Sequence, residues 1–254
     1  MMRVAGIDAC PAGWFAVVCD GQGNWTCEIH ENAQALWERN RHLFLILIDI
    51  PIGLPFEVKR QCDSEARKIL GRRASSVFPA PSREAVRAKT YEEACLRNME
   101  VLGKKISRQT WNISPKIRQV DDLLQSDLSA RATLRESHPE IAFGTLNTGA
   151  VLFHSKKTPA GLGERLRILA AHHSQAEKIM NHAAQTFSRK VLGLDDILDA
   201  LCLAVTAMQP PESLVTLPEF PPLDKLGLPM EIVYSNTFMH TALRGSDPKN
   251  SPLH

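Results

Sequence analysis

Four aspartates stand where apolar chain segments end or begin, and this placement suits metal-ion chemistry. Asp8 and Asp49 each follow a short apolar run directly. Asp196 and Asp199 lie three positions apart at the start of an apolar segment, so on a helix they share one face. Neighbouring strand ends meet at one edge of a sheet, and a helix packed across that edge adds its own side chains. We therefore predict that the four carboxylates form one catalytic site.

Converging carboxylates repel one another, and hard divalent cations with oxygen ligands remove that cost. The expected ligands are Asp8, Asp49 and Asp199, with Glu136 as a further candidate, and the expected cofactor is Mg2+ or Mn2+. Two such ions about 4 Å apart can activate a water and stabilise the leaving oxygen of a phosphodiester. The pattern thus favours hydrolysis of a nucleic-acid backbone.

Each acid also has a structural alternative. Asp8 could serve as a turn residue, Asp49 could cap the chain before Pro51, and Asp195 is the expected cap of the helix that starts beside it. An acid directly after Leu-Ile-Leu-Ile is costly to desolvate, so a purely structural Asp49 needs a hydrogen-bond donor. Asp199 lies one turn inside the helix, close to its apolar face, and this position favours a site role.

The pattern of apolar residues predicts the elements that must position these acids. Strands are expected at residues 3–7, 14–18, 25–29, 43–48 and 132–138, and helices at 31–39, 162–180 and 195–208. Residues 20–23, Asp-Gly-Gln-Gly, are typical of a hairpin turn. Three antiparallel strands, a helix, a fourth strand, an insertion, a fifth strand and a late helix follow the order of a ribonuclease H-like fold. We expect an α/β protein with a mixed sheet flanked by helices.

The predicted domain covers residues 1–208, and residues 209–254 read as a proline-rich C-terminal tail. The chain of 254 residues has 44% hydrophobic and 23% charged residues, which are ordinary globular values. Its longest apolar run has six residues, far short of the roughly 18–20 that cross a bilayer. Arg3 and Asp8 interrupt what would be the apolar part of a signal peptide. A cytoplasmic protein without a membrane partner is therefore expected.

The overall charge of +2 conceals a strong segregation of charge along the chain. Residues 57–118 carry 15 basic and seven acidic side chains, a balance of +8, while the segments before and after them are each at −3. This basic segment belongs to the insertion, which is expected to be mainly helical over about residues 57–130. Basic side chains near a Ser/Pro-rich loop can bind phosphates, and Phe78 in that loop offers a stacking surface. The expected nucleic-acid-binding residues are Arg72, Arg73, Arg83, Lys116, Arg118 and Lys156. Lys104 and Lys105 are expected on a solvated face.

Glu136, His138 and Glu140 alternate along the predicted fifth strand, so all three would project from one face. They could form a second group of ligands beside the aspartates. For His138, the polar face of an edge strand is an equally good interpretation.

Several ordered blocks over about residues 3–208 resemble the predicted-nuclease family known as domain of unknown function 429. They are GIDACPAGW at 6–14, DIPIGLP at 49–55, CDSEAR at 62–67, LGRRASSVF at 70–78, SPKIR at 114–118, ESHPE at 136–140 and DDILDAL at 195–201. The last block is also similar to the final helix of RuvC-type Holliday-junction resolvases. The resemblance implies a ribonuclease H-like fold, with Asp8, Asp49, Asp196 and Asp199 as the metal-site acids.

The leading hypothesis is a nuclease acting on DNA or RNA. A second is a nucleic-acid-binding or scaffold protein that keeps the fold without cleavage. A third, a phosphotransferase, is disfavoured because such proteins duplicate the fold and place glycine-rich turns after the first strand, whereas Asp8 is followed by Ala-Cys-Pro-Ala-Gly.

Overall fold

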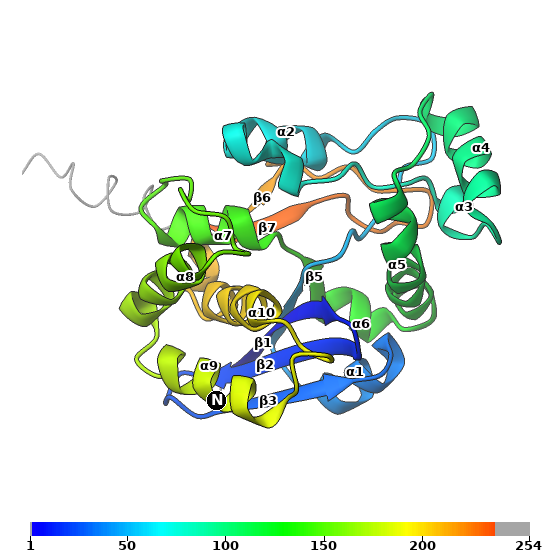
Figure 1. Cartoon of the computed structure of the whole chain (residues 1–254). Coiled ribbons are helices and arrows are strands. Elements are labelled where there is room, and N and C mark those ends of the chain that lie inside the picture. Colours follow the sequence, from blue (N-terminus) through cyan, green and yellow to red (C-terminus); the bar gives the residue numbers. More distant parts are fainter. Residues whose placement is uncertain (1, 237–254) are drawn as a thin grey trace, which may run out of the picture.

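The computed structural model describes residues 2–236 and contains a five-stranded mixed sheet (Figure 1). The strand order is β3-β2-β1-β4-β5. The strands are β1 (Arg3–Cys10), β2 (Gly13–Asp20), β3 (Trp25–His30), β4 (Leu45–Ile48) and β5 (Leu134–Glu136). The pairs β1–β2 and β2–β3 are antiparallel, whereas β1–β4 and β4–β5 are parallel. The predicted mixed α/β sheet flanked by helices is confirmed.

Both faces of the sheet are covered, because the strands alternate their side chains between two cores. Phe15, Val17 and Leu47 pack on one face against α7 (Pro139–Leu146), α8 (Pro159–His172), α9 (Ala176–Thr186) and α10 (Leu194–Ala207). Trp14, Ile46 and Ile48 pack on the other face against α1 (Ala33–Asn40) and α5 (Arg108–Ser126). The predicted last helix is confirmed as α10.

Gly6 allows α10 to approach the sheet closely. A Cβ at this position would lie 2.1 Å from both the Ala200 carbonyl oxygen and the Ala204 nitrogen. Any side chain at position 6 would therefore push the α10 backbone away from β1. This contact brings the acids of α10 over the ends of β1 and β4.

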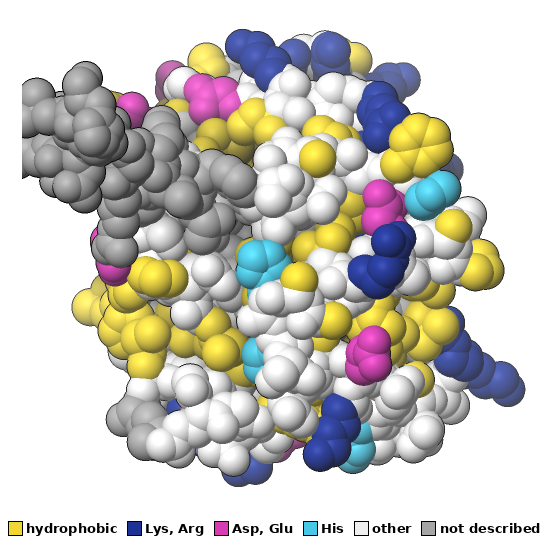
Figure 2. All heavy atoms as spheres, turned by 90° about the vertical axis from the view of Figure 1, so that its left-hand side faces the viewer, with side chains coloured by type: hydrophobic (Ala, Val, Ile, Leu, Met, Phe, Trp, Pro, Cys, Tyr) yellow, Lys and Arg dark blue, Asp and Glu magenta, His cyan; other side chains and the backbone are white. Residues whose placement is uncertain are grey.

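The basic insertion lies between β4 and β5, as expected, and it is mainly helical. It comprises α2 (Gln61–Leu70), the 3₁₀ helix η1 (Gly71–Ser76), α3 (Arg83–Val86), α4 (Tyr91–Leu102), α5 and α6 (Leu128–Thr133). Figure 1 shows α3 and α4 beyond the far end of α5, away from the sheet. On the face shown in Figure 2, Lys and Arg side chains gather along the upper edge, where α2 lies in Figure 1.

Three predicted elements differ in the structure. The first strand was expected to end at Ile7, but β1 continues through Asp8 to Cys10 and pairs with β2 along its whole length. The single helix expected at 162–180 is wrong, because α8 ends at His172 and α9 begins at Ala176. The extended backbone of His173 (φ −143°) turns the chain so that Leu169 and Ile179 both reach the same core. The fifth strand is also shorter than predicted, since Leu128–Thr133 forms α6 before it.

Residues 209–236 of the proline-rich segment fold back onto the domain. They contain η2 (Pro211–Ser213) and an antiparallel pair, β6 (Leu214–Leu217) and β7 (Ile232–Ser235). Val233 in β7 forms a bridge with Ser137, just after β5. Residues 237–254 of the predicted tail lie outside the described residues. Among residues 2–236, we find no helix that combines the length and apolar character needed to cross a bilayer.

Candidate active site

Three predicted acids come together at one edge of the sheet. Ile7 and Ile48 are partners in the parallel pair β1–β4, so Asp8 and Asp49 occupy the next position on each strand. The Asp49 nitrogen donates a hydrogen bond of 3.0 Å to the Ile7 carbonyl oxygen, which fixes this register beyond the last paired residues. Asp199, which is fully buried on α10, completes the group. Asp8, Asp49 and Asp199 are called the acidic cluster below.

The acidic cluster is costly to ionise. Burial raises the pKa of Asp8 well above its ordinary value, and repulsion from Asp49 and Asp199 raises it further. Burial also raises the pKa of Asp49, although His138 and Lys156 oppose that shift. The pKa of Asp199 rises to about 6, again chiefly through burial. These carboxylates are therefore short of compensating positive charge.

Lys156 supplies a cation to the acidic cluster. Its ammonium group donates a hydrogen bond to Asp199 Oδ2 and forms an ion pair with it. Burial lowers the pKa of Lys156, but Asp199 and Asp8 raise it, and the net change is upward. The other oxygen of Asp199, Oδ1, is buried and has no hydrogen-bond partner among the described residues. One lysine thus only partly satisfies the cluster.

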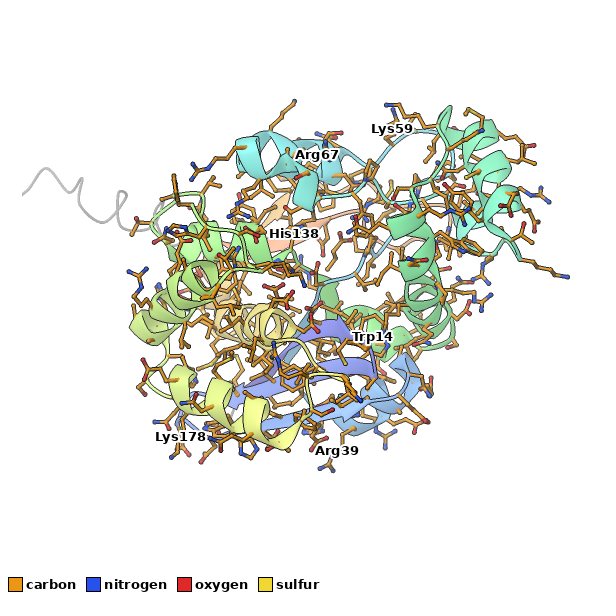
Figure 3. The ribbon with its side chains drawn as sticks, viewed as in Figure 1. Trp14, Arg39, Lys59, Arg67, His138 and Lys178 are labelled. Carbon is orange, nitrogen blue, oxygen red and sulfur yellow. The ribbon has the colours of Figure 1, made fainter. Side chains whose placement is uncertain are left out.

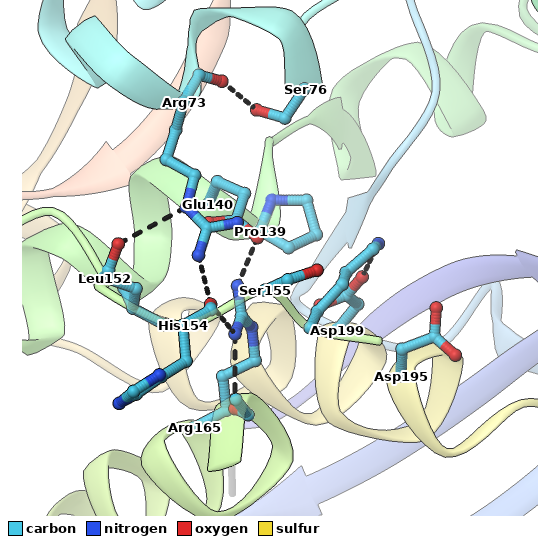
Figure 4. Close-up of polar contacts among 12 residues, drawn as sticks. Arg73, Ser76, Pro139, Glu140, Leu152, His154, Ser155, Arg165, Asp195 and Asp199 are labelled. Atoms are coloured by element: carbon cyan, nitrogen blue, oxygen red, sulfur yellow. Dashed lines mark hydrogen bonds and ion pairs between the residues drawn. The ribbon is translucent and has the colours of Figure 1, made fainter. Parts of the chain in front are cut away.

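A buried ion pair lies next to the acidic cluster (Figure 4). Arg165 on α8 is fully buried and pairs with Glu140 on α7, which adds to the negative potential at Asp49 and Asp199. Arg165 Nη1 also donates to the His154 carbonyl oxygen at 3.3 Å, two residues before Lys156. The Glu164 carboxylate accepts the N–H groups of Phe153 and His154, both at 2.9 Å. These bonds position the loop that carries Lys156.

Glu140 was considered only as part of a second ligand group on a strand face, and its position depends on where β5 ends. The prediction that Glu136, His138 and Glu140 share a strand face is wrong, because β5 ends at Glu136 and α7 begins at Pro139. Glu140 lies in the first turn of α7, and His138 immediately precedes that helix. The signal in the sequence was the Pro-Glu pair, since proline favours the first position of a helix.

Glu136 does not join the acidic cluster. Its Oε2 atom accepts hydrogen bonds of 2.6 Å from Arg60 Nη2 and from the Ile52 nitrogen. Burial raises the pKa of Glu136 to about 8 despite the neighbouring Arg60. Arg60 is itself fully buried and also forms an ion pair with Asp63 at 3.6 Å. Glu136 therefore belongs to a separate buried network.

The acids at the start of α10 differ from their expected roles. Asp196 Oδ2 accepts a hydrogen bond of 2.9 Å from the Gly193 nitrogen, so Asp196 caps the helix. Asp195, the predicted cap, instead pairs with Lys157. Burial raises the pKa of Asp196. Asp196 remains beside the cluster, because it contributes to the raised pKa of Asp8.

The predicted nucleic-acid-binding residues are spread over several environments. Arg72 and Arg73 donate to carbonyl oxygens in residues 151–154, and the Arg72 guanidinium stacks on the Phe153 ring. Arg118 is exposed on α5. Lys156 joins the acidic cluster.

Arg83 and Lys116 are held by the protein itself. Arg83 forms ion pairs with Asp121 at 2.9 Å and Asp224 at 2.5 Å, and only 13% of its side chain is exposed. Lys116 donates to the Gly13 carbonyl oxygen and stacks on Trp14, and burial lowers the pKa of its ammonium group.

The donor set of the acidic cluster consists of carboxylate oxygens, which suits Mg2+ or Mn2+ better than zinc. Within residues 2–236, no three Asp, Glu, His or Cys side chains already stand close enough together to hold a metal ion. The unpaired Asp199 Oδ1 and the raised pKa values show where added positive charge would be most favourable. Cation binding at the cluster would thus require the carboxylates to move closer together.

A comparison with protein families identifies the chain. Residues 6–222 match the family described as Protein of unknown function (DUF429). The chain belongs to the DUF429 family. No curated protein and no solved structure matched the chain. The part of this DUF429 chain that matches includes the acidic cluster, Lys156, the Glu140–Arg165 pair and the whole basic insertion.

Proposed function

We propose that the chain is a metal-dependent nuclease of ribonuclease H-like fold that hydrolyses phosphodiester bonds of DNA or RNA. The observation that carries this proposal is the convergence of Asp8, Asp49 and Asp199 from two parallel strands and a helix packed across their ends. All three carboxylates have raised pKa values, and one lysine opposes them. This excess of buried negative charge supports an occupant with a charge of +2 or more.

Asp8, Asp49 and Asp199 would hold Mg2+ or Mn2+, with Asp196 at the margin. Bound there, such ions supply the activation of a water and the stabilisation of the leaving oxygen. Lys156, released from Asp199, would be free to pair with a phosphate oxygen of the substrate. Arg165 would keep Glu140 and the 153–156 loop in place during that exchange. Arg72 and Arg73, beside the same loop, are suited to contact the strand further from the scissile bond.

The test combines metal binding with cleavage. Wild-type protein and the single variants Asp8→Asn, Asp49→Asn and Asp199→Asn are titrated with Mn2+ by calorimetry and then incubated with single-stranded, duplex and branched DNA and RNA. Each variant should lose Mn2+-dependent cleavage and bind Mn2+ at least about tenfold more weakly, while its circular dichroism spectrum stays unchanged. Asp122→Asn is the matched control, because Asp122 is an exposed acid on α5 that does not belong to the cluster.

The ion pair between Lys156 and Asp199 favours one alternative. A lysine can partly neutralise buried acids without a metal, so a nucleic-acid-binding or scaffold protein could retain this fold. That alternative replaces the nuclease proposal if the wild type binds Mn2+ no better than the triple aspartate variant and cuts none of the substrates.

A further inference from the structure

A basic pocket lies in the insertion, and none of its lining residues belongs to the acidic cluster. It has a volume of about 400 Å3 and is enclosed by parts of α2, α4, α5 and the segments that connect them. This volume falls within the range of about 300–1,000 Å3 that is usual for small-molecule sites. Five lining side chains are basic, namely Lys59, Arg60, Arg67, Lys104 and Lys105, and one, Asp63, is acidic.

Four of these bases, Lys59, Arg67, Lys104 and Lys105, form no ion pair with a carboxylate within residues 2–236. Arg67 Nη1 donates a hydrogen bond of 2.6 Å to the Val77 carbonyl oxygen, but the residue is exposed and its other guanidinium nitrogens can reach a ligand. Lys59 and Arg67 lie on the same upper side of the molecule in Figure 3. Lys104 and Lys105 are exposed, as expected, and they also follow the C-terminus of α4 and form part of the pocket wall. There they also offset the partial negative charge of that helix end.

The wall of the pocket adds two features that favour an anion. Arg60 has a fully buried side chain, and its Nη1 atom has no hydrogen-bond acceptor among the residues that the structure describes. The 19-residue helix α5 begins at the pocket, where Ser107 and Thr110 line it, and its first turn has no acidic residue. The N-terminus of such a helix carries partial positive charge and favours anions.

Phe78 makes the pocket suited to more than inorganic phosphate. This ring lines the pocket, is half-buried and forms no aromatic pair within residues 2–236. An accessible aromatic ring beside several cations matches the two parts of a nucleotide, because the ring stacks on the base while the cations bind the phosphate.

We propose that this pocket binds a nucleotide, with its phosphate at Lys59, Arg67, Lys104 and Lys105 and its base on Phe78. The nucleotide is either free in solution or the terminal residue of a strand, and both share the phosphate and the base. The proposal does not depend on cleavage or on metal binding at the acidic cluster.

The test measures binding by calorimetry with the full chain in EDTA at low salt, so that no metal occupies the acidic cluster. The probes are inorganic phosphate, adenosine, adenosine monophosphate, and octathymidylate with and without a 5′-phosphate. The variants are Lys104→Gln/Lys105→Gln, Lys59→Gln and Phe78→Leu. Lys178→Gln/Lys190→Gln is the control, because it removes the same charge from exposed sites at α9 and just beyond it, and Figure 3 shows Lys178 on the opposite side of the molecule.

The double lysine variant should bind adenosine monophosphate at least about tenfold more weakly than the wild type, and the control should stay within about twofold. Phe78→Leu should weaken the nucleotide about fivefold or more and leave inorganic phosphate unchanged. Tighter binding of the 5′-phosphorylated strand than of the mononucleotide assigns the pocket to strand ends, and equal binding assigns it to free nucleotides.

Three results would overturn the proposal. They are no binding of either phosphorylated probe to the wild type, equal affinity in the control and both lysine variants, and adenosine binding as tightly as its monophosphate. Lys59→Gln, a change in an exposed residue before α2, keeps the test decisive if the double variant does not fold.

Discussion

Replacing Asp199 by asparagine should stabilise the metal-free protein at neutral and alkaline pH. The Asp199 side chain is almost completely buried, and its Oδ1 atom has no hydrogen-bond partner in the described part of the chain. Its pKa in the folded protein is about 6, compared with an ordinary value of 3.8. The folded state therefore holds its proton more tightly than the unfolded state does, and stability falls as the pH rises between these two values.

The two pKa values differ by about 2, and each pH unit corresponds to about 1.4 kcal/mol. Ionisation of Asp199 thus costs the folded state up to about 3 kcal/mol above pH 6. Asparagine resembles the protonated acid and removes this cost. Lys156 loses its partner, but its side chain is 34% exposed and can reach water, so most of the gain should remain.

The assay is urea unfolding of wild type and Asp199→Asn in EDTA at several pH values between 4.5 and 8. The variant should be more stable by about 1–3 kcal/mol at pH 8, and the difference should shrink steadily towards pH 4.5. Asp122→Asn, on the exposed side of α5, should show no such dependence. The reasoning would be refuted if Asp199→Asn were less stable than wild type by the same margin at both ends of the range.

Three further predictions concern the groups that hold the site together. Gly6→Ala should destabilise the fold by about 3 kcal/mol or more in urea unfolding, because the new Cβ would lie 2.1 Å from the α10 backbone. Gly21→Ala is the control and should be nearly neutral, because a Cβ at position 21 would meet no atom within 4 Å. Arg165→Met should lower the free energy of unfolding by about 3–5 kcal/mol, since it leaves Glu140 buried without its cation. The double variant Arg165→Met/Glu140→Gln should recover part of that loss. Equal stability of the single and double variants would contradict the ion-pair argument. Mn2+ should raise the melting temperature of the wild type and leave that of Asp49→Asn unchanged, and an equal rise in both proteins would argue against a metal at the acidic cluster.

Local patterns in the sequence were sufficient for the sheet and for most of the acidic cluster. The apolar runs before Asp8 and Asp49 predicted two strands, and the structure pairs those strands in parallel with Ile7 opposite Ile48, although β1 continues past Asp8 to Cys10. The spacing of Asp196 and Asp199 predicted a shared helix face, and α10 carries both. These inferences succeeded because strand and helix periodicities depend on residues close together in the chain.

The partners of charged residues could not be predicted in the same way. Arg83 was expected to contact nucleic acid, but it pairs with Asp121 and with Asp224, which lies 141 residues away in the sequence. Glu136 was expected at the metal site, but it pairs with Arg60, whereas Glu140 lies near the aspartates. Charge alone does not select among the many possible partners on other elements.

The sequence by itself determined the α/β class, the order of the strands along the chain and the acids that follow their apolar runs, because burial patterns and turn residues act locally. Only the tertiary structure decided that Lys156 pairs with Asp199, that Glu140 rather than Glu136 lies near the cluster, and that Lys59, Lys104 and Lys105 line one pocket. These contacts join segments that are far apart in the sequence, such as Lys156 and Asp199 at 43 positions, and they depend on how the insertion and α7 to α10 pack around the sheet.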